Sequence, residues 1–183
     1  MSRFTPSAAP AADDVTGRGP WAWLQDLVGR ASAQEPTEAG PRPALADALQ
    51  TMGFSARAVL EGFAAVLGVS VAEVADPDAA TIGRADAAGL SVLLPPLLDH
   101  HAHDVRRAAQ RWVSCPALAY RLEPTVVEGW LRGAGPMAAL LEARLAEEGL
   151  AMLGPAALHR LAVVASRPGV REAAQTWLAR VEV

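Results

Sequence analysis

Along most of the chain, hydrophobic positions recur with the spacing of one face of a helix. The spacing is clearest in an octet that occurs twice, as Val105–Trp112 and as Val170–Trp177, with the shared pattern V-R-x-A-A-Q-x-W. In each copy the Val, both Ala and the Trp fall at i, i+3, i+4 and i+7, which places them on one helical face. The paired Ala let a neighbouring helix come close, and the Trp fills the space one turn further on. The pattern therefore predicts that these faces belong to the core.

Each copy of the octet follows an apolar segment and a tight turn. Leu93–His101 precedes the first copy and Leu158–Ala165 precedes the second, so each copy completes a helical hairpin. The copies are 65 residues apart, which corresponds to two units of roughly thirty residues. We expect a middle unit centred on 135–141, which keeps the apolar face and lacks the V-R signature.

The remaining periodic stretches extend this helical pattern along the chain. We predict helices over 44–52, 55–67, 87–101, 105–114, 124–132, 136–149, 155–166 and 169–181. Pro95 and Pro96 should kink or break the third of these, and Asp104 should cap the start of the fourth. Because we find no convincing alternating pattern of a strand, we predict an all-α fold of stacked helical hairpins, near 89–115 and 154–181.

Residues 1–43 differ from the predicted all-α domain at 44–183. They hold six of the fourteen prolines and are rich in small and polar residues. Such a composition buries too little apolar surface to fold, so we predict a disordered or extended tail. One apolar island interrupts it, and its spacing predicts a short amphipathic helix at 20–30.

The tail helix carries an unusual density of large apolar side chains. Trp21, Leu24 and Val28 fall on one face, and Trp23 and Leu27 form an adjacent i, i+4 pair. Such a helix is suited to a hydrophobic groove. The groove could belong to a partner or to the chain's own domain, and the sequence leaves both open.

Two stretches of the chain resemble a known family of helical repeats. Asp104–Ala109 and Pro168–Ala174 resemble the start of the second helix in HEAT-like repeats, including the leucine-rich variant type. The resemblance covers about 90–115 and 155–180. It implies a stack of hairpins that presents a surface to partners, and it implies no activity.

Composition narrows the function classes. The net charge of −4 gives no general attraction to nucleic acid or anionic lipid. The single Cys115 excludes an internal disulfide and a multi-cysteine metal site. No apolar run is long enough to span a membrane, and we expect no signal peptide.

The sixteen basic residues are all Arg, with no Lys and no Asn, which indicates a GC-rich bacterial genome. We therefore expect a bacterial cytoplasmic protein.

A histidine tract between Asp99 and Asp104 is one candidate for chemistry. On a helix, Asp99 and His103 would be i, i+4 neighbours, as would His100 and Asp104, and such pairs can hold zinc or a similar metal. In the other interpretation the tract is a polar helix end, where His faces the negative end of the helix dipole. Because a short histidine-rich tract is only a compositional hint of a metal site, the helix end is favoured, and we expect no cofactor.

A basic stripe of Arg106, Arg107 and Arg111 is another candidate. Such a stripe can grip a nucleic-acid backbone, or it can form ion pairs with an acidic partner. The stretch 63–74 also has the spacing of a DNA-reading helix–turn–helix. Its second helix would carry Glu73, which repels phosphate, so a plain helix corner is favoured.

Together these features predict a non-catalytic scaffold, adaptor, assembly factor or accessory subunit that binds another protein. The residues expected to make the contacts are Trp21, Trp23, Leu24, Leu27, Val28, Arg106, Arg107 and Arg111. The alternatives are a metal-binding protein or metalloenzyme built on the histidine tract, and a nucleic-acid binder built on the basic stripe. The scaffold hypothesis expects that removal of residues 1–43 leaves the fold intact and weakens partner binding.

Overall fold

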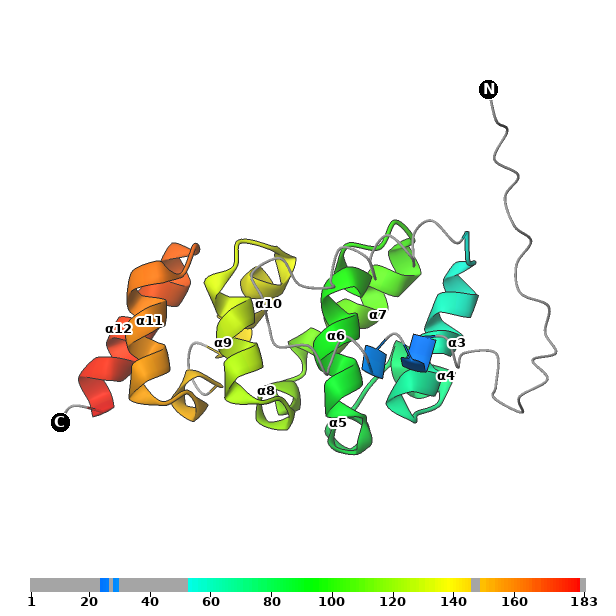
Figure 1. Ribbon diagram of the computed structural model, residues 1–183, viewed down its shortest axis with the longest axis horizontal. Helices are drawn as coiled ribbons and strands as arrows, with labels where there is room; N and C mark the ends of the chain where they lie inside the picture. Colours follow the sequence, from blue (N-terminus) through cyan, green and yellow to red (C-terminus); the bar gives the residue numbers. More distant parts are fainter. Residues whose placement is uncertain (1–23, 27, 30–52, 146–148, 182–183) are drawn as a thin grey trace, which may run out of the picture.

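The structure is an extended stack of helices. It is a computed structural model that describes residues 24–26, 28–29, 53–145 and 149–181. Within these ranges every regular element is a helix, and the helices stand side by side along the long axis of the molecule (Figure 1). The predicted all-α fold is confirmed. The tail prediction for residues 1–43 and the helix predicted at 44–52 lie largely or entirely outside the described residues.

The stack begins with a helix corner. Helix α3 (Ala56–Leu67) starts where the Ser55 side chain accepts a hydrogen bond from the Ala58 amide. It ends at Gly68, whose φ of 69° is the left-handed conformation that glycine adopts most easily. Helices α4 (Val71–Ala75) and α5 (Ala79–Arg84) follow. With five residues, α4 has little more than one turn, so this region is a corner as expected.

Three hairpins follow the corner. Each packs its two helices against one another, and the short helices α8 (Ala117–Arg121) and η1 (Gly149–Met152) lie between them. The hairpins are α6 (Ala87–Leu98) with α7 (His103–Ser114), α9 (Pro124–Arg132) with α10 (Pro136–Leu145), and α11 (Pro155–Val164) with α12 (Pro168–Val181). The chain is therefore a corner followed by a first, a middle and a last hairpin.

Around the first hairpin, the structure contradicts the predicted cap and one of the two outcomes predicted for the prolines, which were a kink or a break of the helix. Pro95 and Pro96 do not break α6, which continues to Leu98. The leucines around the prolines are buried, and their packing outweighs the backbone hydrogen bonds that proline cannot donate. Asp104 does not cap α7, because the helix starts at His103 and the cap position is Ala102.

A single hydrophobic core runs the length of the stack. In α7 all four apolar positions of the octet are buried, as the spacing predicts; they are Val105, Ala108, Ala109 and Trp112. In α12 the equivalent Val170 and Ala174 are buried, whereas Ala173 and Trp177 are partly exposed. The two copies of one sequence pattern therefore meet different surroundings.

Candidate interaction surfaces

The arginine of the repeated octet has a structural role in both copies. Arg106 donates from Nη1 to the carbonyl oxygens of His100 at 2.6 Å and His101 at 2.7 Å. Arg171 donates from Nη1 to the carbonyl oxygen of Ala165 at 2.7 Å. His100 and Ala165 both lie six residues before their arginine. Each guanidinium thus satisfies carbonyls just past the end of the preceding helix, which otherwise have no partner within that helix.

Other members of the basic stripe are also used within the chain. Arg111 donates to the carbonyl oxygen of Ala75 at 2.7 Å and to Oδ1 of Asp76 at 3.2 Å, at the end of α4. Arg107 is exposed and makes no hydrogen bond or ion pair with another described residue. Of the three arginines predicted to contact a partner, the structure therefore engages Arg106 and Arg111 in holding the stack together.

In the middle hairpin, the end of the first helix is capped by a residue from outside that hairpin. Its second helix has Ala139 at the fourth position, where α7 has Arg106 and α12 has Arg171. At the end of α9, the carbonyl oxygen of Arg132 instead accepts hydrogen bonds from the amide and from Oγ of Ser166, both at 3.1 Å. Ser166 lies between α11 and α12, so a residue of the last hairpin supplies the hydrogen bonds to the end of α9 in the middle hairpin.

The histidine tract forms the turn between α6 and α7, so the i, i+4 pairs of a continuous helix do not arise. His100 is fully buried, and its Nδ1 accepts a hydrogen bond from the Ala102 amide at 3.1 Å. Its ring stacks on that of His101, with the ring centroids 4.4 Å apart. His103 and Asp104 are exposed, with Nδ1 and Oδ1 3.6 Å apart. Within the described ranges no group of three or more His, Cys, Asp or Glu is arranged to hold a metal ion.

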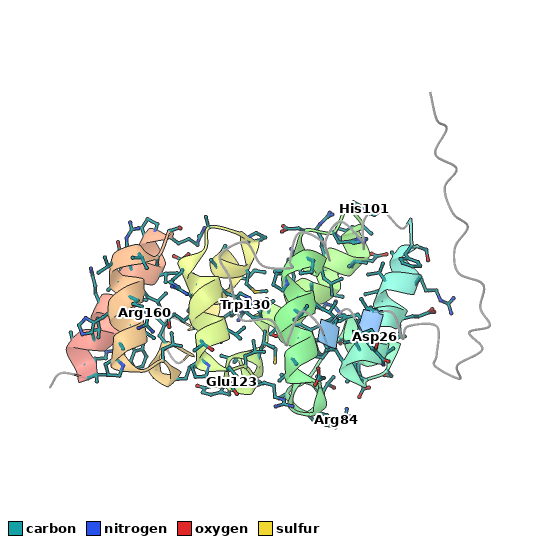
Figure 2. All side chains as sticks on the ribbon, in the orientation of Figure 1. Asp26, Arg84, His101, Glu123, Trp130 and Arg160 are labelled. Atoms are coloured by element: carbon teal, nitrogen blue, oxygen red, sulfur yellow. The ribbon has the colours of Figure 1, made fainter. Side chains whose placement is uncertain are left out.

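Ion pairs join the last hairpin to the middle one. Glu128 of α9 is buried, with 6% of its side chain exposed, and it receives two hydrogen bonds from Arg160 of α11. Arg160 is labelled in Figure 2. The distances are 2.7 Å from Nε to Oε1 and 2.9 Å from Nη2 to Oε2. These bonds lower the pKa of the Glu128 carboxyl below its ordinary value. Arg167 also pairs with Glu142 of α10.

The Glu128 pair was not predicted, although the sequence holds a signal for it. Glu128 lies between Val127 and Leu131 on the apolar face of α9, and both of these neighbours are buried. A carboxylate on a buried helical face needs a partner because burying an unpaired charge is costly. The identity of that partner, Arg160, depends on how α11 is placed, which local spacing does not reveal.

The described part of the tail helix is packed onto the chain itself. We call Leu24, Gln25, Asp26, Val28 and Gly29 the tail segment; all five are helical. Leu24 and Val28 are 2% and 4% exposed and belong to the core, whereas the other three are exposed.

This burial bears on the partner contacts predicted for the tail. Leu24 and Val28 lie in the chain's own core, whereas Trp21, Trp23 and Leu27 lie outside the described residues. The burial of Leu24 and Val28 also argues against the expectation that the fold stays intact when residues 1–43 are removed. Their removal would take two side chains from the core.

A cavity of about 170 Å³ lies between α6 and the middle hairpin. Its walls include Asp99, Met137 and Trp130, which is labelled in Figure 2. Trp130 is 4% exposed, and no described residue accepts a hydrogen bond from its Nε1. The cavity is thus lined by apolar side chains, Asp99 and Trp130, which by themselves define no ligand.

The last hairpin exposes aliphatic side chains. Val163, Val164 and Val181, which we call the terminal valines, are 77%, 55% and 54% exposed. On α11, Val163 lies on the opposite face from the buried Leu158 and Leu161. The last hairpin therefore presents apolar side chains to solvent.

Comparison with known proteins gives no assignment. No protein-family model matches the chain, and no curated protein or solved structure is significantly similar to it. Within the described ranges no helix is both long enough and apolar enough to cross a bilayer. Function must therefore be argued from the surfaces described above.

Proposed function

We propose that the protein is a non-catalytic protein-interaction scaffold, built as a short array of HEAT-like hairpins. Three consecutive hairpins share one stacking direction and one core, which supports a repeat architecture. The V-R signature supports the HEAT-like likeness further, since Arg106 and Arg171 make the same backbone contact in the first and last hairpins. Arrays of this kind usually bind partners on their extended surfaces.

The observation that carries the proposal is the exposure of the terminal valines. In a stacked array the apolar side chains of each hairpin are normally covered by its neighbours. Here Val163, on the face of α11 opposite the buried Leu158 and Leu161, is 77% exposed. Exposed aliphatic side chains that no neighbouring hairpin covers are typical of a surface that another protein covers. We place the partner contact there, in an adaptor, assembly factor or accessory subunit of a bacterial cytoplasm.

The test compares two substitutions that each add one carboxylate to an exposed helical position. Affinity-tagged protein is incubated with lysate of its own organism, and bound proteins are identified by mass spectrometry. We expect Val163→Glu to lose the partner that the wild type captures. Ala143→Glu, on the exposed side of α10, is the matched control and should retain it. Equal capture by both variants, or capture of no partner by the wild type, would overturn the proposal.

A further inference from the structure

The arginine contact of the repeated octet surrounds a histidine in the first hairpin and an alanine in the last. His100 lies six residues before Arg106, and Ala165 lies six residues before Arg171; each arginine donates to the carbonyl oxygen at that earlier position. Both positions are buried, with 0% of His100 and 1% of Ala165 exposed. The contact is therefore compatible with a methyl group, and the first hairpin buries an imidazole that the contact itself does not need.

The hydrogen bond of the His100 ring requires a neutral imidazole. Its Nδ1 accepts a hydrogen bond from the amide of Ala102, the cap position of α7, which has no side-chain cap. A ring nitrogen that accepts a hydrogen bond carries no proton, so the single ring proton is on Nε2. We call this arrangement the closed turn. In it, the neutral ring is tied to the start of α7.

A proton on Nδ1 of His100 is incompatible with the closed turn. Two donors would face one another, the bond to Ala102 would be lost, and a fully buried ring would carry a charge. The guanidinium of Arg106 already places a positive charge at the carbonyl oxygen of His100. The ring that stacks on His100 belongs to His101, a second titratable group, which is labelled in Figure 2.

The carboxylates near this turn give a buried imidazolium little compensation. Asp99 and Asp104 are exposed, so solvent screens their charges. The helices α3, α4, α8 and α10 pack against α6 or α7, and their other charged side chains are Arg121 and Arg144 or carboxylates paired with arginine. Those pairs are Glu61 with Arg57, Glu73 with Arg84, and Glu142 with Arg167.

We propose that His100 is an acid-sensitive switch of the turn between α6 and α7. Uptake of one proton by the ring opens the turn, loosens the start of α7 and releases Arg106 from its two carbonyl oxygens. The turn of the last hairpin has Ala165 at this position and stays closed. Histidine titrates near physiological pH, so the switch responds to mild acid. The inference does not rest on the proposed function.

Proton linkage gives the sign and size of the effect. A histidine in an open, solvated turn takes up a proton below about pH 6.5, whereas the closed turn holds the neutral ring. The closed turn is therefore fully favoured above about pH 6.5, and is weakened by up to about tenfold for each pH unit below it. From pH 7.5 to pH 5.0 the open population should rise about thirtyfold.

The experiment measures amide hydrogen exchange by NMR in the full-length protein at pH 7.5 and pH 5.0, with each rate divided by the intrinsic rate at that pH. The matched probes are the amides of Arg106 and Arg171, which donate to the carbonyl oxygens of Ala102 at 3.2 Å and of Arg167 at 3.3 Å. We expect protection of the Arg106 amide to fall about thirtyfold and that of Arg171 by less than about twofold. Equal changes at the two amides would overturn the proposal.

Two variants assign the effect to one ring. His100→Ala copies the last hairpin and should abolish the pH dependence at the Arg106 amide. His101→Ala alters the exposed neighbouring ring, is the matched control, and should retain the dependence. The reverse result would overturn the proposal.

A measurement on the wild type covers the case in which His100→Ala does not fold, which circular dichroism would show. NMR of the ring nitrogens should find the His100 proton on Nε2 for as long as the Arg106 amide is protected. A His100 ring that takes up a second proton while that amide keeps its full protection would overturn the proposal.

Discussion

The first and last hairpins carry the same octet in different surroundings. Trp112 is fully buried, packs against Phe63 at 5.6 Å between ring centroids, and donates from Nε1 to the carbonyl oxygen of Val74 at 2.9 Å. Trp177 occupies the same octet position and is only partly buried, with the Arg180 guanidinium 4.9 Å from its ring centroid. The difference teaches that the octet encodes a face ready for packing, and that the neighbouring helices decide whether the face becomes core.

The two hairpins are also held by different forces. The first packs against helices on both sides, the corner helices α3 and α4 and the middle hairpin. The last hairpin packs on the middle one, and two ion pairs cross that boundary, Glu128 with Arg160 and Glu142 with Arg167. We therefore expect the titration of carboxylates to act more strongly on the last hairpin than on the first.

The largest expected effect comes from the two tryptophans. Trp112→Ala should lower the free energy of unfolding by about 3–5 kcal/mol, because it empties a fully buried site. Trp177→Ala should cost about 1 kcal/mol, the scale of an exposed cation–π contact with some packing. Urea unfolding followed by circular dichroism measures both. Equal losses would show that the two surroundings do not differ in the way described.

Glu128 offers the next test, since its ion pair joins the middle hairpin to the last one and does not involve the first. Glu128→Gln keeps the shape and removes the charge, and should cost about 1–2 kcal/mol at pH 7, because Arg160 is half exposed and solvent screens the pair. Hydrogen exchange should show the loss of protection in α11 and α12 and little change in α7. Loss of protection in α7 of the same size would contradict the distinction between the hairpins.

Acid should reproduce that effect in the wild type. The pKa of Glu128 is lowered from its ordinary 4.5, so in acid the unfolded chain takes up a proton before the folded one does. The stabilisation is present above about pH 4.5 and is lost as the pH falls towards the lowered value. Urea midpoints measured between pH 7 and pH 3 should fall less in Glu128→Gln than in the wild type. Parallel curves would contradict the role given to this carboxylate.

Glu73 adds a second acid-sensitive carboxylate, in the corner and outside both hairpins. A hydrogen bond from the Ser70 amide, together with one from Arg84, lowers the pKa of its carboxyl to about 2. Its contribution is therefore lost between pH 4.5 and about pH 2. Measurements at pH 3 and above consequently retain part of it.

The arginine caps should have smaller and similar effects in both hairpins. Arg106→Met and Arg171→Met keep much of the aliphatic stem and remove the donors to the helix-end carbonyls. Each should cost about 1 kcal/mol, the net value of a partly exposed hydrogen bond. Thermal unfolding of the two variants measures this. A loss in only one of them would mean that the shared signature does not have a shared role.

The smallest expected effect belongs to the octet's glutamine. Gln110 and Gln175 are exposed in both copies. Replacement of either by Ala should change the free energy of unfolding by less than about 0.5 kcal/mol, as at ordinary surface positions. A larger change at one position would reveal a contact that distinguishes the copies.

The sequence predicted the hairpins because their signal is local. The spacing of the residues that are buried in α7 and α9 can be recognised within the sequence of a single helix. The short helices were harder to find, since five or six residues span less than two turns. Their caps were nonetheless readable, as with Ser70 and Glu73 at the start of α4. A break at Pro95 and Pro96 was one of the predicted outcomes, and it does not occur because tertiary packing overrides the local rule.

The surfaces were less predictable because they depend on where side chains from separate helices meet. Arg106 read as surface charge, and its reach to a carbonyl six residues earlier depends on the turn geometry. Its repetition at Arg171 was the available signal. The burial of Leu24 and Val28 against the stack could not be separated from docking on a partner, because both use the same amphipathic pattern.

The hydrogen bonds from Ser166 to Arg132 have a consequence for the order in which the chain folds during its synthesis. In the first hairpin the capping residue is Arg106, so its hydrogen bonds to His100 and His101 can form once residue 106 has left the ribosome. The middle hairpin obtains its contact at the end of α9 only after residue 166 has emerged, 34 positions downstream. Nascent chains tend to fold from the N-terminus as they are made. In a nascent chain stalled between these two points, the first hairpin should therefore have its Arg106 hydrogen bonds, whereas the middle hairpin should still lack the hydrogen bonds from Ser166 to Arg132.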